Sequence, residues 1–537
     1  LMRTAGLSLN SFWWKNSIGS MEQRKRPGAP TSWYFTAEKM NYGPCEWVKS
    51  AYVADPECEF IVGINISTES PEMNGKYAEF LTAEKGASDL ADIRAEYGVE
   101  KPVKVFAYEL GNEVDGSMDA DEYCRRIKLS IAAIKKADKN AKFIACGKTY
   151  PVTYDRWSDE WRSWHKTILR EAGSEIDYIS YHAYYDGVPT ASQEKYLDVI
   201  SSDIKEITGS DRIKLAVTEQ ARWNESWNTG NAEDDRVLAL AGCLSTADFL
   251  NRMYNRTDVA AANYYCFPGS VLVRDGATGE ICLSGIAKLY NEYADKLGDY
   301  VVKSELSAPG REGSLTALPT LKGADGLEIV MANKDLSTDV NIALSLEGEY
   351  TLVGKTVFTA ENATDTVTSA DTQNIIYSVV TEENIPHVSC LSVPAKSVVF
   401  FTLKRTGGAA VRNTGRICTA EDFEDYEVTG SCLTGPGQTV GSFVTSTVHK
   451  GWNDSMRVEA AKVPGTDNTV LQVCGGASED NPACIGYGGD YSGVSSRHFA
   501  SVDIMQTHYA FNLGLRTMVH DGELSYYELA LPPDYSR

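Results

Sequence analysis

The stretch Val105-Phe-Ala-Tyr-Glu-Leu-Gly-Asn-Glu-Val-Asp-Gly116 decides the fold of this chain. Its first six residues are apolar enough to be buried on both faces, which is typical of a strand in a parallel sheet. Gly111 then allows the backbone to turn, and Asn112 and Glu113 follow at the carboxyl end of the strand. In (β/α)8 barrels the functional side chains gather at that end. A carboxylate beside an amide at this place predicts that Glu113 is a general acid and that Asn112 binds the ligand by hydrogen bonds.

A second apolar run ends in the same way. Ile213-Lys-Leu-Ala-Val-Thr-Glu-Gln-Ala-Arg-Trp223 places Glu219 near the end of a predicted strand. A βα unit takes about 30 to 35 residues, so the stretch from Glu113 to Glu219 fits three units. The sequence therefore assigns the two glutamates to strands 4 and 7, whose ends face each other across a barrel mouth. Retaining glycosidases need two carboxyl groups about 5 to 5.5 Å apart.

Two more strands are predicted between the glutamates, at 140–147 and 176–185. The second of them ends in His182-Ala-Tyr184, which offers an imidazole and a phenol. Both are neutral hydrogen-bonding groups that suit sugar hydroxyls or hold a carboxylate in place. A lone histidine is more often structural, and that reading stays open for His182 at this point.

These motifs resemble glycoside hydrolase family 51, the α-L-arabinofuranosidases of the large (β/α)8 glycosidase clan. The runs that carry the resemblance are Arg3–Gly6, Trp14–Gly19 with Gln23–Pro27, Gly63–Asn65, Leu110–Gly116, Ala145–Gly147, Asp177–Tyr185 and Glu219 with Trp223. They follow the family's order. The chain departs from the family at Thr218 and Gln220, where Asp and Trp are usual, and at Leu7, where a second Gly is usual.

The resemblance implies Glu113 as the acid/base and Glu219 as the nucleophile. The substrate contacts that it predicts are Asn112, His182, Tyr184, Arg3 and Trp223. The activity implied is an exo-acting, retaining α-L-arabinofuranosidase that removes arabinofuranosyl residues from hemicellulose or arabinan by double displacement. The sequence holds no phosphate-binding loop, His-Glu-x-x-His motif or Gly-x-Ser-x-Gly elbow, so neither a cofactor nor a catalytic metal is predicted.

The composition limits the partners. The formal net charge is −23 over 537 residues, which disfavours nucleic acid and anionic membranes because both attract basic patches. No run of about 18 apolar residues suits a membrane span. The charge is compatible with a neutral polysaccharide or oligosaccharide substrate. The oligomeric state is left open.

The fold class predicted is α/β, a (β/α)8 TIM barrel over residues 1–300 followed by all-β sandwich domains. The visible barrel strands number seven and are predicted at Leu1–Leu9, Glu59–Ile66, Val103–Leu110, Asn140–Gly147, Ile176–Tyr185, Ile213–Trp223 and Asp258–Tyr265. Strand 1 is therefore expected upstream of residue 1, and the gap next to 1–9 is predicted to stay vacant. Helices are predicted at Asn74–Thr82, Asp119–Ala137, Asp234–Tyr254 and Ile286–Leu297.

Beyond residue 300 the pattern changes to strands without intervening helices. Residues 301–405 are predicted to form a β-sandwich, 406–414 a linker, and 415–537 a second β-sandwich that is cut short at its end. The last segment is either a carbohydrate-binding module, with Trp452 as its one Trp platform, or a purely structural domain. A binding module favours secretion, although no signal peptide is visible at the start as given.

Three functions therefore compete. The first is the α-L-arabinofuranosidase, and the second is another retaining glycosidase of the same clan, a β-xylosidase or an endoglucanase, which would use the same carboxylates on another sugar. The third is a non-catalytic glycan-binding protein. The unusual neighbours of Glu219 keep the third reading open.

Overall fold

The computed structural model describes residues 1–407 except for 5, 31, 33–36, 149–158, 187–188, 225, 227–229, 232–235, 266–270 and 347. Beyond 407 it describes only the strands named below. The chain divides into two compact units. The first holds Leu1–Val340, Tyr350–His387 and Ser392–Thr406, and the second holds Asn341–Glu349, Val388–Leu391 and Gly407–Arg537. The predicted linker at 406–414 and the platform Trp452 lie almost wholly outside the described residues.

A seven-stranded parallel sheet in the order β1 to β7 forms the centre of the first unit, and the predicted barrel with further all-β sheets is confirmed. Its strands are β1 (Met2–Thr4), β2 (Phe60–Ile64), β3 (Val105–Leu110), β4 (Phe143–Ala145), β5 (Tyr178–Tyr185), β6 (Lys214–Arg222) and β7 (Val259–Tyr264). The predicted first strand, Leu1–Leu9, is too long, because the chain turns into a 3-10 helix at Leu7–Ser11. Strands β1 and β7 are the two ends of the sheet, and Asn263 Nδ2 of β7 donates a hydrogen bond to the carbonyl of Leu1 at 3.3 Å.

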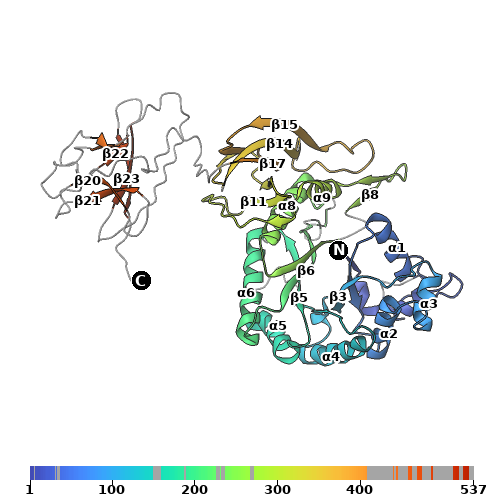
Figure 1. Cartoon of the computed structure of the whole chain (residues 1–537). Helices are drawn as coiled ribbons and strands as arrows, with labels where there is room; N and C mark the ends of the chain where they lie inside the picture. The colour runs from blue at the N-terminus through green and yellow to red at the C-terminus, as the bar shows by residue number, and fades with distance from the viewer. Residues whose placement is uncertain are drawn as a thin grey trace. The chain divides into compact units, whose positions relative to one another are not determined.

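Helices surround this sheet on its outer side (Figure 1). They are α1 (Pro44–Ala54), α2 (Pro71–Thr82), α3 (Asp89–Glu96), α4 (Ala120–Ala137), α5 (Asp159–Ala172), α6 (Thr190–Thr208), α8 (Leu240–Tyr254) and α9 (Gly285–Lys296). The predicted cap of α4 is confirmed, since the Asp119 side chain accepts a hydrogen bond from the Glu122 amide. Helix α8 begins later than the predicted Asp234, because Ala239 forms a β-bridge with Thr366 before the helix starts.

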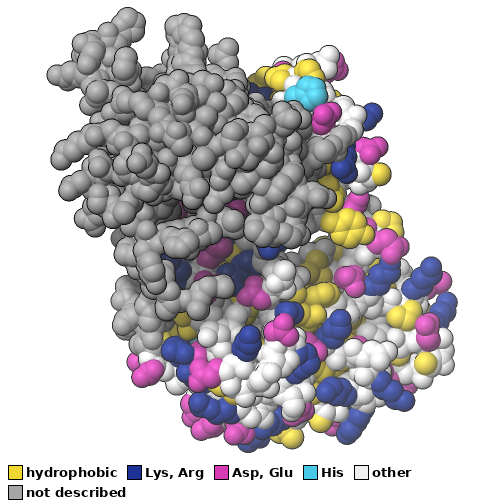
Figure 2. All heavy atoms as spheres, turned by 60° about the vertical axis from the view of Figure 1, so that its left-hand side comes forward, with side chains coloured by type: hydrophobic (Ala, Val, Ile, Leu, Met, Phe, Trp, Pro, Cys, Tyr) yellow, Lys and Arg dark blue, Asp and Glu magenta, His cyan; other side chains and the backbone are white. Residues whose placement is uncertain are grey.

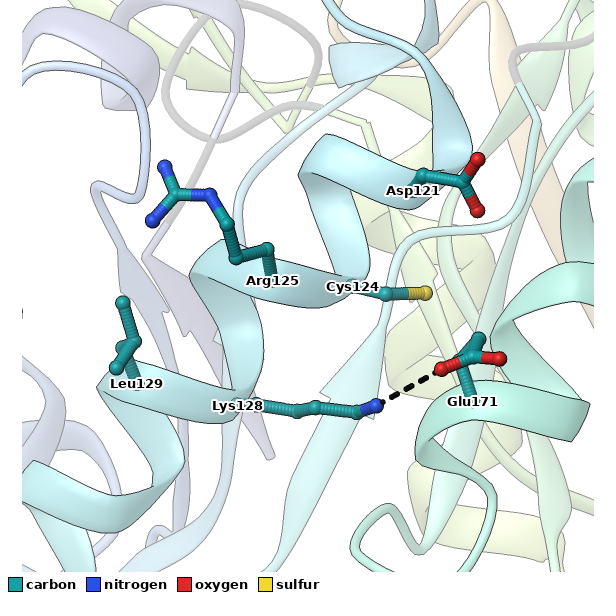
Figure 3. Close-up of a pocket in the computed structure, with 6 residues that line it drawn as sticks. All are labelled: Asp121, Cys124, Arg125, Lys128, Leu129 and Glu171. Atoms are coloured by element: carbon teal, nitrogen blue, oxygen red, sulfur yellow. Dashed lines mark hydrogen bonds and ion pairs between the residues drawn. The ribbon is translucent and has the colours of Figure 1, made fainter.

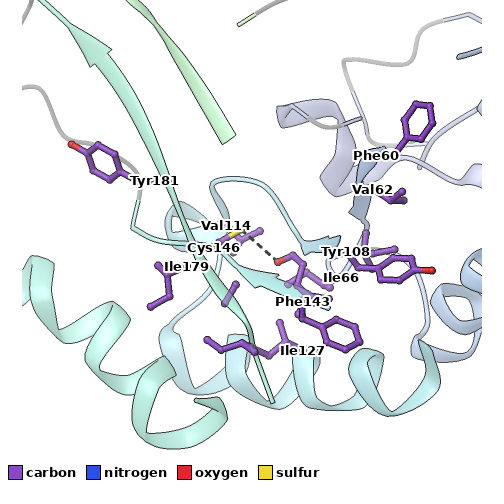
Figure 4. Packing of buried hydrophobic residues seen from close by; sticks show 14 of the residues in the cluster. Phe60, Val62, Ile66, Tyr108, Val114, Ile127, Phe143, Cys146, Ile179 and Tyr181 are labelled. Atoms are coloured by element: carbon purple, nitrogen blue, oxygen red, sulfur yellow. Dashed lines mark hydrogen bonds between the residues drawn. The ribbon is translucent and has the colours of Figure 1, made fainter. Parts of the chain in front are cut away.

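Two apolar layers lie on opposite faces of the sheet. On the outer face, residues of β2 to β6 pack with the helices, as Phe60, Tyr108, Ile127 and Phe143 show in Figure 4. On the inner face a separate cluster takes one residue from each of six neighbouring strands, with Phe106 packed against it. We call this cluster the apolar floor, and it consists of Ile61, Ala107, Ile144, Tyr178, Ala216 and Ala261. Side chains further toward the carboxyl ends of the strands therefore lie over a layer of buried apolar residues.

A six-stranded sheet in the order β10-β11-β12-β17-β14-β15 follows the barrel. Its strands are β10 (Tyr300–Val301), β11 (Leu315–Lys322), β12 (Gly326–Asn333), β14 (Glu349–Ala360), β15 (Ile376–Ile385) and β17 (Ser397–Gly407). Helices α8 and α9 pack against it through one buried cluster that includes Leu244, Ile286, Val330 and Phe400. The short strands β13 (Val340–Ala343) and β16 (Cys390–Val393) pair with each other.

A charged contact joins this sheet to the barrel. Lys334, which directly follows β12, places Nζ 2.8 Å from Asp248 Oδ2 on α8 and 3.3 Å from Asp186 Oδ1. Asp186 comes directly after β5 and adopts a positive φ of 71°. Asp248 is almost fully buried, and its other partner is Arg252 on the same helix. The lysine thus stabilises two carboxylates of the barrel.

The described strands beyond residue 407 are short and antiparallel. They are β18 (Thr439–Val440), β19 (Phe443–Thr445), β20 (Arg457–Lys462), β21 (Thr469–Cys474), β22 (Ile485–Tyr487), β23 (Asn512–Met518) and β24 (Leu524–Ala530). They form the sheets β18-β19-β22, β20-β21 and β23-β24. The predicted strands at 470–473 and 526–529 lie in β21 and β24, whereas those at 423–426 and 501–504 lie outside the described residues. The predicted domain boundaries stay predictions.

The described surface carries acidic and basic side chains side by side in the view of Figure 2. Within the described part of the chain, no helix combines the length and the apolar character that a membrane crossing needs.

Candidate active site

Glu113 is presented by an unusual turn at the end of β3. Gly111 has a φ of 92°, and Glu113 itself lies in the left-handed region with φ 48° and ψ 47°. Non-glycine residues rarely adopt this conformation, and when they do the surroundings hold them there. Here Asn10 bonds both the amide and the carbonyl of Asn112, at 3.1 and 2.5 Å. The loop after β1 therefore fixes the backbone that carries Glu113.

This turn gives a first prediction. A Cβ on Gly111 would lie 2.9 Å from Val114 Cγ1 and 3.1 Å from Ile66 Cγ1, and the positive φ adds strain. We expect Gly111→Ala to lower the free energy of unfolding by about 1 to 3 kcal/mol, measured by urea denaturation. Gly116→Ala is the matched control, because a Cβ there meets nothing within 4 Å. Equal losses in both variants would contradict the role given to the turn.

A β-bulge aims Glu219 into the barrel. Strands β5 and β6 pair Tyr181 with Val217 but His182 with Glu219, so Thr218 is an extra residue in β6. Ala216 belongs to the apolar floor, and strict alternation would then point Glu219 toward the outer helices. A bulge reverses this alternation, and bulges are common beside active sites for that reason.

His182 lies between the two glutamates. Its Nδ1 is 2.7 Å from Glu113 Oε1 and 3.6 Å from Glu219 Oε2, and its Nε2 is 3.2 Å from the Thr218 hydroxyl. One carboxylate oxygen of Glu113 and one of Glu219 lie within 4.8 Å of each other. The structure thus brings the predicted pair close together at the carboxyl ends of β3 and β6.

Arg3 is at the centre of the polar contacts. Its Nη1 donates to Glu219 Oε1, its Nη2 to Asn112 Oδ1 and its Nε to Glu109 Oε2, each at 2.6 Å. The guanidinium is nearly buried, and Glu109 has no exposed surface. Sequence reasoning missed Glu109, Asn10 and the contact of Thr218. The available signal for Glu109 was its position two residues after Ala107, because alternate residues of a strand lie on the same face, here the inner face of β3.

The charges shift the protonation of these groups. Burial by itself raises the pKa of Glu219, but His182, Arg3 and the Tyr184 hydroxyl hold that pKa below its usual value. Burial opposes the charge of His182, yet the two glutamates raise the pKa of its imidazole. Burial and Glu219 both raise the pKa of Tyr184, whose hydroxyl donates to Glu219 Oε2 at 2.7 Å. Glu219 is therefore kept as a carboxylate that accepts hydrogen bonds.

Aromatic rings line the side of the site at Tyr184. Trp223, just beyond β6, meets the Tyr184 ring edge-to-face at a centroid distance of 6.3 Å. Tyr265, just beyond β7, does the same at 6.0 Å and is partly exposed. All the predicted site residues therefore lie at the carboxyl ends of the barrel strands or, for Arg3, reach them from β1. Trp223 reaches the site through its edge-to-face ring contact with Tyr184.

Glu113, His182 and Glu219 also offer atoms of the kind that ligate metal ions. A guanidinium already occupies Glu219 Oε1, and its positive charge would repel a cation at this place. We therefore assign no metal to the group. A surface hollow on α4 and α5, shown in Figure 3, contains none of the predicted site residues. Its charged groups include the Lys128–Glu171 ion pair at 3.1 Å.

Comparison with known proteins agrees with this geometry. Residues 3–200 match the family model of the alpha-L-arabinofuranosidase 1 domain. The resemblance predicted from the sequence is confirmed. The matched arabinofuranosidase domain includes Arg3, Glu113, His182 and Tyr184, while Glu219 lies beyond its end.

Curated relatives of the arabinofuranosidase domain are similar over part of their length. An intracellular exo-alpha-(1->5)-L-arabinofuranosidase of Streptomyces lividans is 27% identical over 186 residues, which are 34% of this chain and 27% of the relative. One with the same description from Acetivibrio thermocellus is 26% identical over 248 residues, 43% of this chain and 47% of the relative. The aligned part thus spans less than half of either relative.

Solved structures share the fold over more of the chain. The GH51 alpha-L-arabinofuranosidase from Thermotoga petrophila RKU-1 has a TM-score of 0.63 at 18% identity and covers 74% of this chain and 86% of its own. The alpha-L-arabinofuranosidase from Thermotoga maritima, solved as an arabinose complex, has a TM-score of 0.62 at 18% identity and covers 75% and 86%. At this identity the likeness shows the fold.

Proposed function

We propose that this protein is a retaining α-L-arabinofuranosidase that removes arabinofuranosyl residues from the non-reducing ends of hemicellulose or arabinan. One observation carries the proposal: Glu113 and Glu219 approach within 4.8 Å at the carboxyl ends of β3 and β6, with His182 between them. The family match over residues 3–200 supports the choice of sugar. The substrate is an oligosaccharide or polysaccharide.

The two glutamates have different roles in this mechanism. Glu219 attacks the anomeric carbon while Glu113 gives a proton to the leaving oxygen. Water, activated by Glu113, then hydrolyses the glycosyl-enzyme. Arg3, Tyr184 and His182 hold Glu219 in place. Asn112 Nδ2 is buried and has no hydrogen-bond partner in the described part of the chain, so it is a donor that a sugar hydroxyl can satisfy.

A panel of aryl glycosides tests the proposal. The p-nitrophenyl α-L-arabinofuranoside should be hydrolysed with retention, seen by proton NMR of the first-formed sugar, and faster than the β-D-xylopyranoside or β-D-cellobioside. Preference for either of the other two would replace the arabinofuranosidase by a β-xylosidase or an endoglucanase. Binding of arabino-oligosaccharide by calorimetry without turnover of any glycoside would establish a glycan-binding protein instead.

Thr218 provides a finer prediction. Thr218→Val keeps the shape of the side chain but removes the hydroxyl that contacts His182 Nε2. Loss of one hydrogen bond predicts a decrease in kcat of about 2- to 10-fold, because the imidazole is less well oriented between the glutamates. KM should stay close to the wild-type value. Thr218→Ser, which retains the hydroxyl, is the control and should remain near wild-type activity; an equal decrease there would assign the effect to packing.

For residues 415–537 we propose the carbohydrate-binding role, with secretion as its corollary. The short antiparallel sheets β18-β19-β22, β20-β21 and β23-β24 support a β-rich module. Binding of arabinan by a chain with Trp452→Ala, compared with the unaltered chain in an affinity gel, tests the role. If arabinan in the gel slows the migration of Trp452→Ala as much as that of the unaltered chain, a structural domain is favoured.

A further inference from the structure

Glu109 is the deepest charged side chain of the site. It lies on β3 between the apolar floor and the guanidinium of Arg3, with no exposed surface. Its Oε2 accepts from Arg3 Nε at 2.6 Å, and its Oε1 has no hydrogen-bond partner among the residues that the structure describes. A buried carboxylate is costly unless a counter-charge compensates it. Among the described residues, Arg3 is the one side chain that forms a hydrogen bond or ion pair with Glu109, and the mechanism proposed above does not use Glu109.

Arg3 therefore has two carboxylates for one positive charge. Glu109 binds one edge of the guanidinium, and Glu219 Oε1 binds Nη1 at 2.6 Å. During the first chemical step one of these two charges is lost. Glu219 Oε forms a bond to the anomeric carbon, the glycosidic C–O bond breaks, its electron pair goes to the leaving oxygen, and Glu113 supplies the proton. Glu219 becomes a neutral ester, and Glu113 becomes a carboxylate.

The negative charge thus moves from the Arg3 side of the site to the His182 side. Glu113 Oε1 already has His182 Nδ1 at 2.7 Å to receive it. Arg3, by contrast, would be left as a buried cation without a counter-ion if Glu219 were its only partner. Asn112 is neutral and compensates no charge.

We propose that Glu109 is a positioning residue that remains the counter-ion of Arg3 while Glu219 is esterified. This inference rests on the proposed function. Before the reaction Glu109 shares the guanidinium, so that Glu219 is not held too tightly to attack. In the glycosyl-enzyme Glu109 alone neutralises Arg3 and keeps it directed at Asn112. The titratable groups around the pair are Arg3 from β1, Glu113 after β3, Cys146 after β4, and His182, Tyr184 and Glu219 from β5 and β6.

The main test replaces Glu109 by glutamine, which keeps the shape and removes the charge. We expect kcat on p-nitrophenyl α-L-arabinofuranoside to fall about 10- to 100-fold while KM changes less than about 2-fold. The acid limb of kcat/KM, which follows Glu219 in the free enzyme, should move to lower pH, because Arg3 then acts on Glu219 alone. Glu109→Asp should recover part of kcat.

Two comparisons separate this role from simple support of the fold. Glu328→Gln removes another buried carboxylate, bonded to Thr402 in the six-stranded sheet, and should change neither kcat nor the acid limb. Because loss of one member of a buried ion pair can prevent folding, Arg3→Gln and the double variant Arg3→Gln/Glu109→Gln complete a cycle. The double variant should be no less active and no less stable than Arg3→Gln. Additive losses would overturn the proposal.

A final measurement needs no turnover. In protein labelled with carbon-13 at the glutamate carboxyl groups, the Glu219 signal is assigned by its disappearance in Glu219→Gln. Its pKa should be lower in Glu109→Gln than in the wild type; an unchanged pKa would overturn the inference. If the wild-type protein binds arabino-oligosaccharide but hydrolyses no arabinofuranoside, the proposed function is refuted. The comparison of the Glu219 pKa in the wild type and in Glu109→Gln still tests the role of Glu109 in that case.

Discussion

Replacing Glu219 by alanine is expected to lower kcat by about 10⁵-fold on every glycoside, whatever its leaving group, which is the scale of loss when a covalent nucleophile is removed. No other described carboxylate is in a position to replace it, since Glu113 is bound to His182 and Glu109 lies beneath Arg3. The measurement is hydrolysis of aryl α-L-arabinofuranosides with leaving groups from dinitrophenol to phenol. Glu219→Gln, which keeps the volume, should be equally inactive.

Azide gives a stereochemical check on this variant. With Glu219→Ala, azide can occupy the space of the missing carboxylate and attack the substrate directly. The product should be the arabinofuranosyl azide of inverted configuration, identified by NMR. Formation of the retained azide by this variant would show that another group serves as the nucleophile.

The second large effect concerns Glu113. Glu113→Ala should lower turnover of substrates with poor leaving groups by about 10²- to 10⁴-fold, the usual contribution of a general acid. Dinitrophenyl substrates should still react in the first step, because their phenolate leaves without a proton. The glycosyl-enzyme then accumulates, since Glu113 no longer activates water, and a burst of dinitrophenol should precede slow turnover.

External azide should restore turnover of Glu113→Ala on the dinitrophenyl substrate, and here the azide product should have the retained configuration. The two variants therefore differ in the stereochemistry of the rescued product, which allows each to control the other. Equal loss on activated and poor substrates, with no rescue, would contradict the acid/base role of Glu113.

The main parts of the barrel could be predicted because they depend on local patterns. Short apolar runs that end in polar residues marked β3 and β6, with the glutamates at their ends, and the other five strands were predicted around them, the first of them too long. The helix at Asp89–Glu96 was missed, although Ser88 caps it by accepting from the Ala91 amide. Its short length and weak amphipathic pattern explain the omission.

The details of the site depended on long-range contacts that local patterns do not contain. The bulge at Thr218 could not be predicted from the sequence of β6, because a strand that is buried on both faces shows no alternation to interrupt. Glu109 read as part of an apolar strand, and only the fold brings it to Arg3 from the start of the chain. The same holds for Asn10, whose contact with Asn112 joins the loops after β1 and β3.

Lys334 limits how this protein can be divided for engineering. A fragment that stops at residue 300 would remove the ammonium that Asp186 and Asp248 share. Asp186 directly follows β5, the strand of His182 and Tyr184, and Asp248 lies on α8. Domain shuffling that exchanges the six-stranded sheet for another must therefore bring a cation to the same place, or the carboxylate that directly follows the catalytic strand β5 will lose its contact with this lysine.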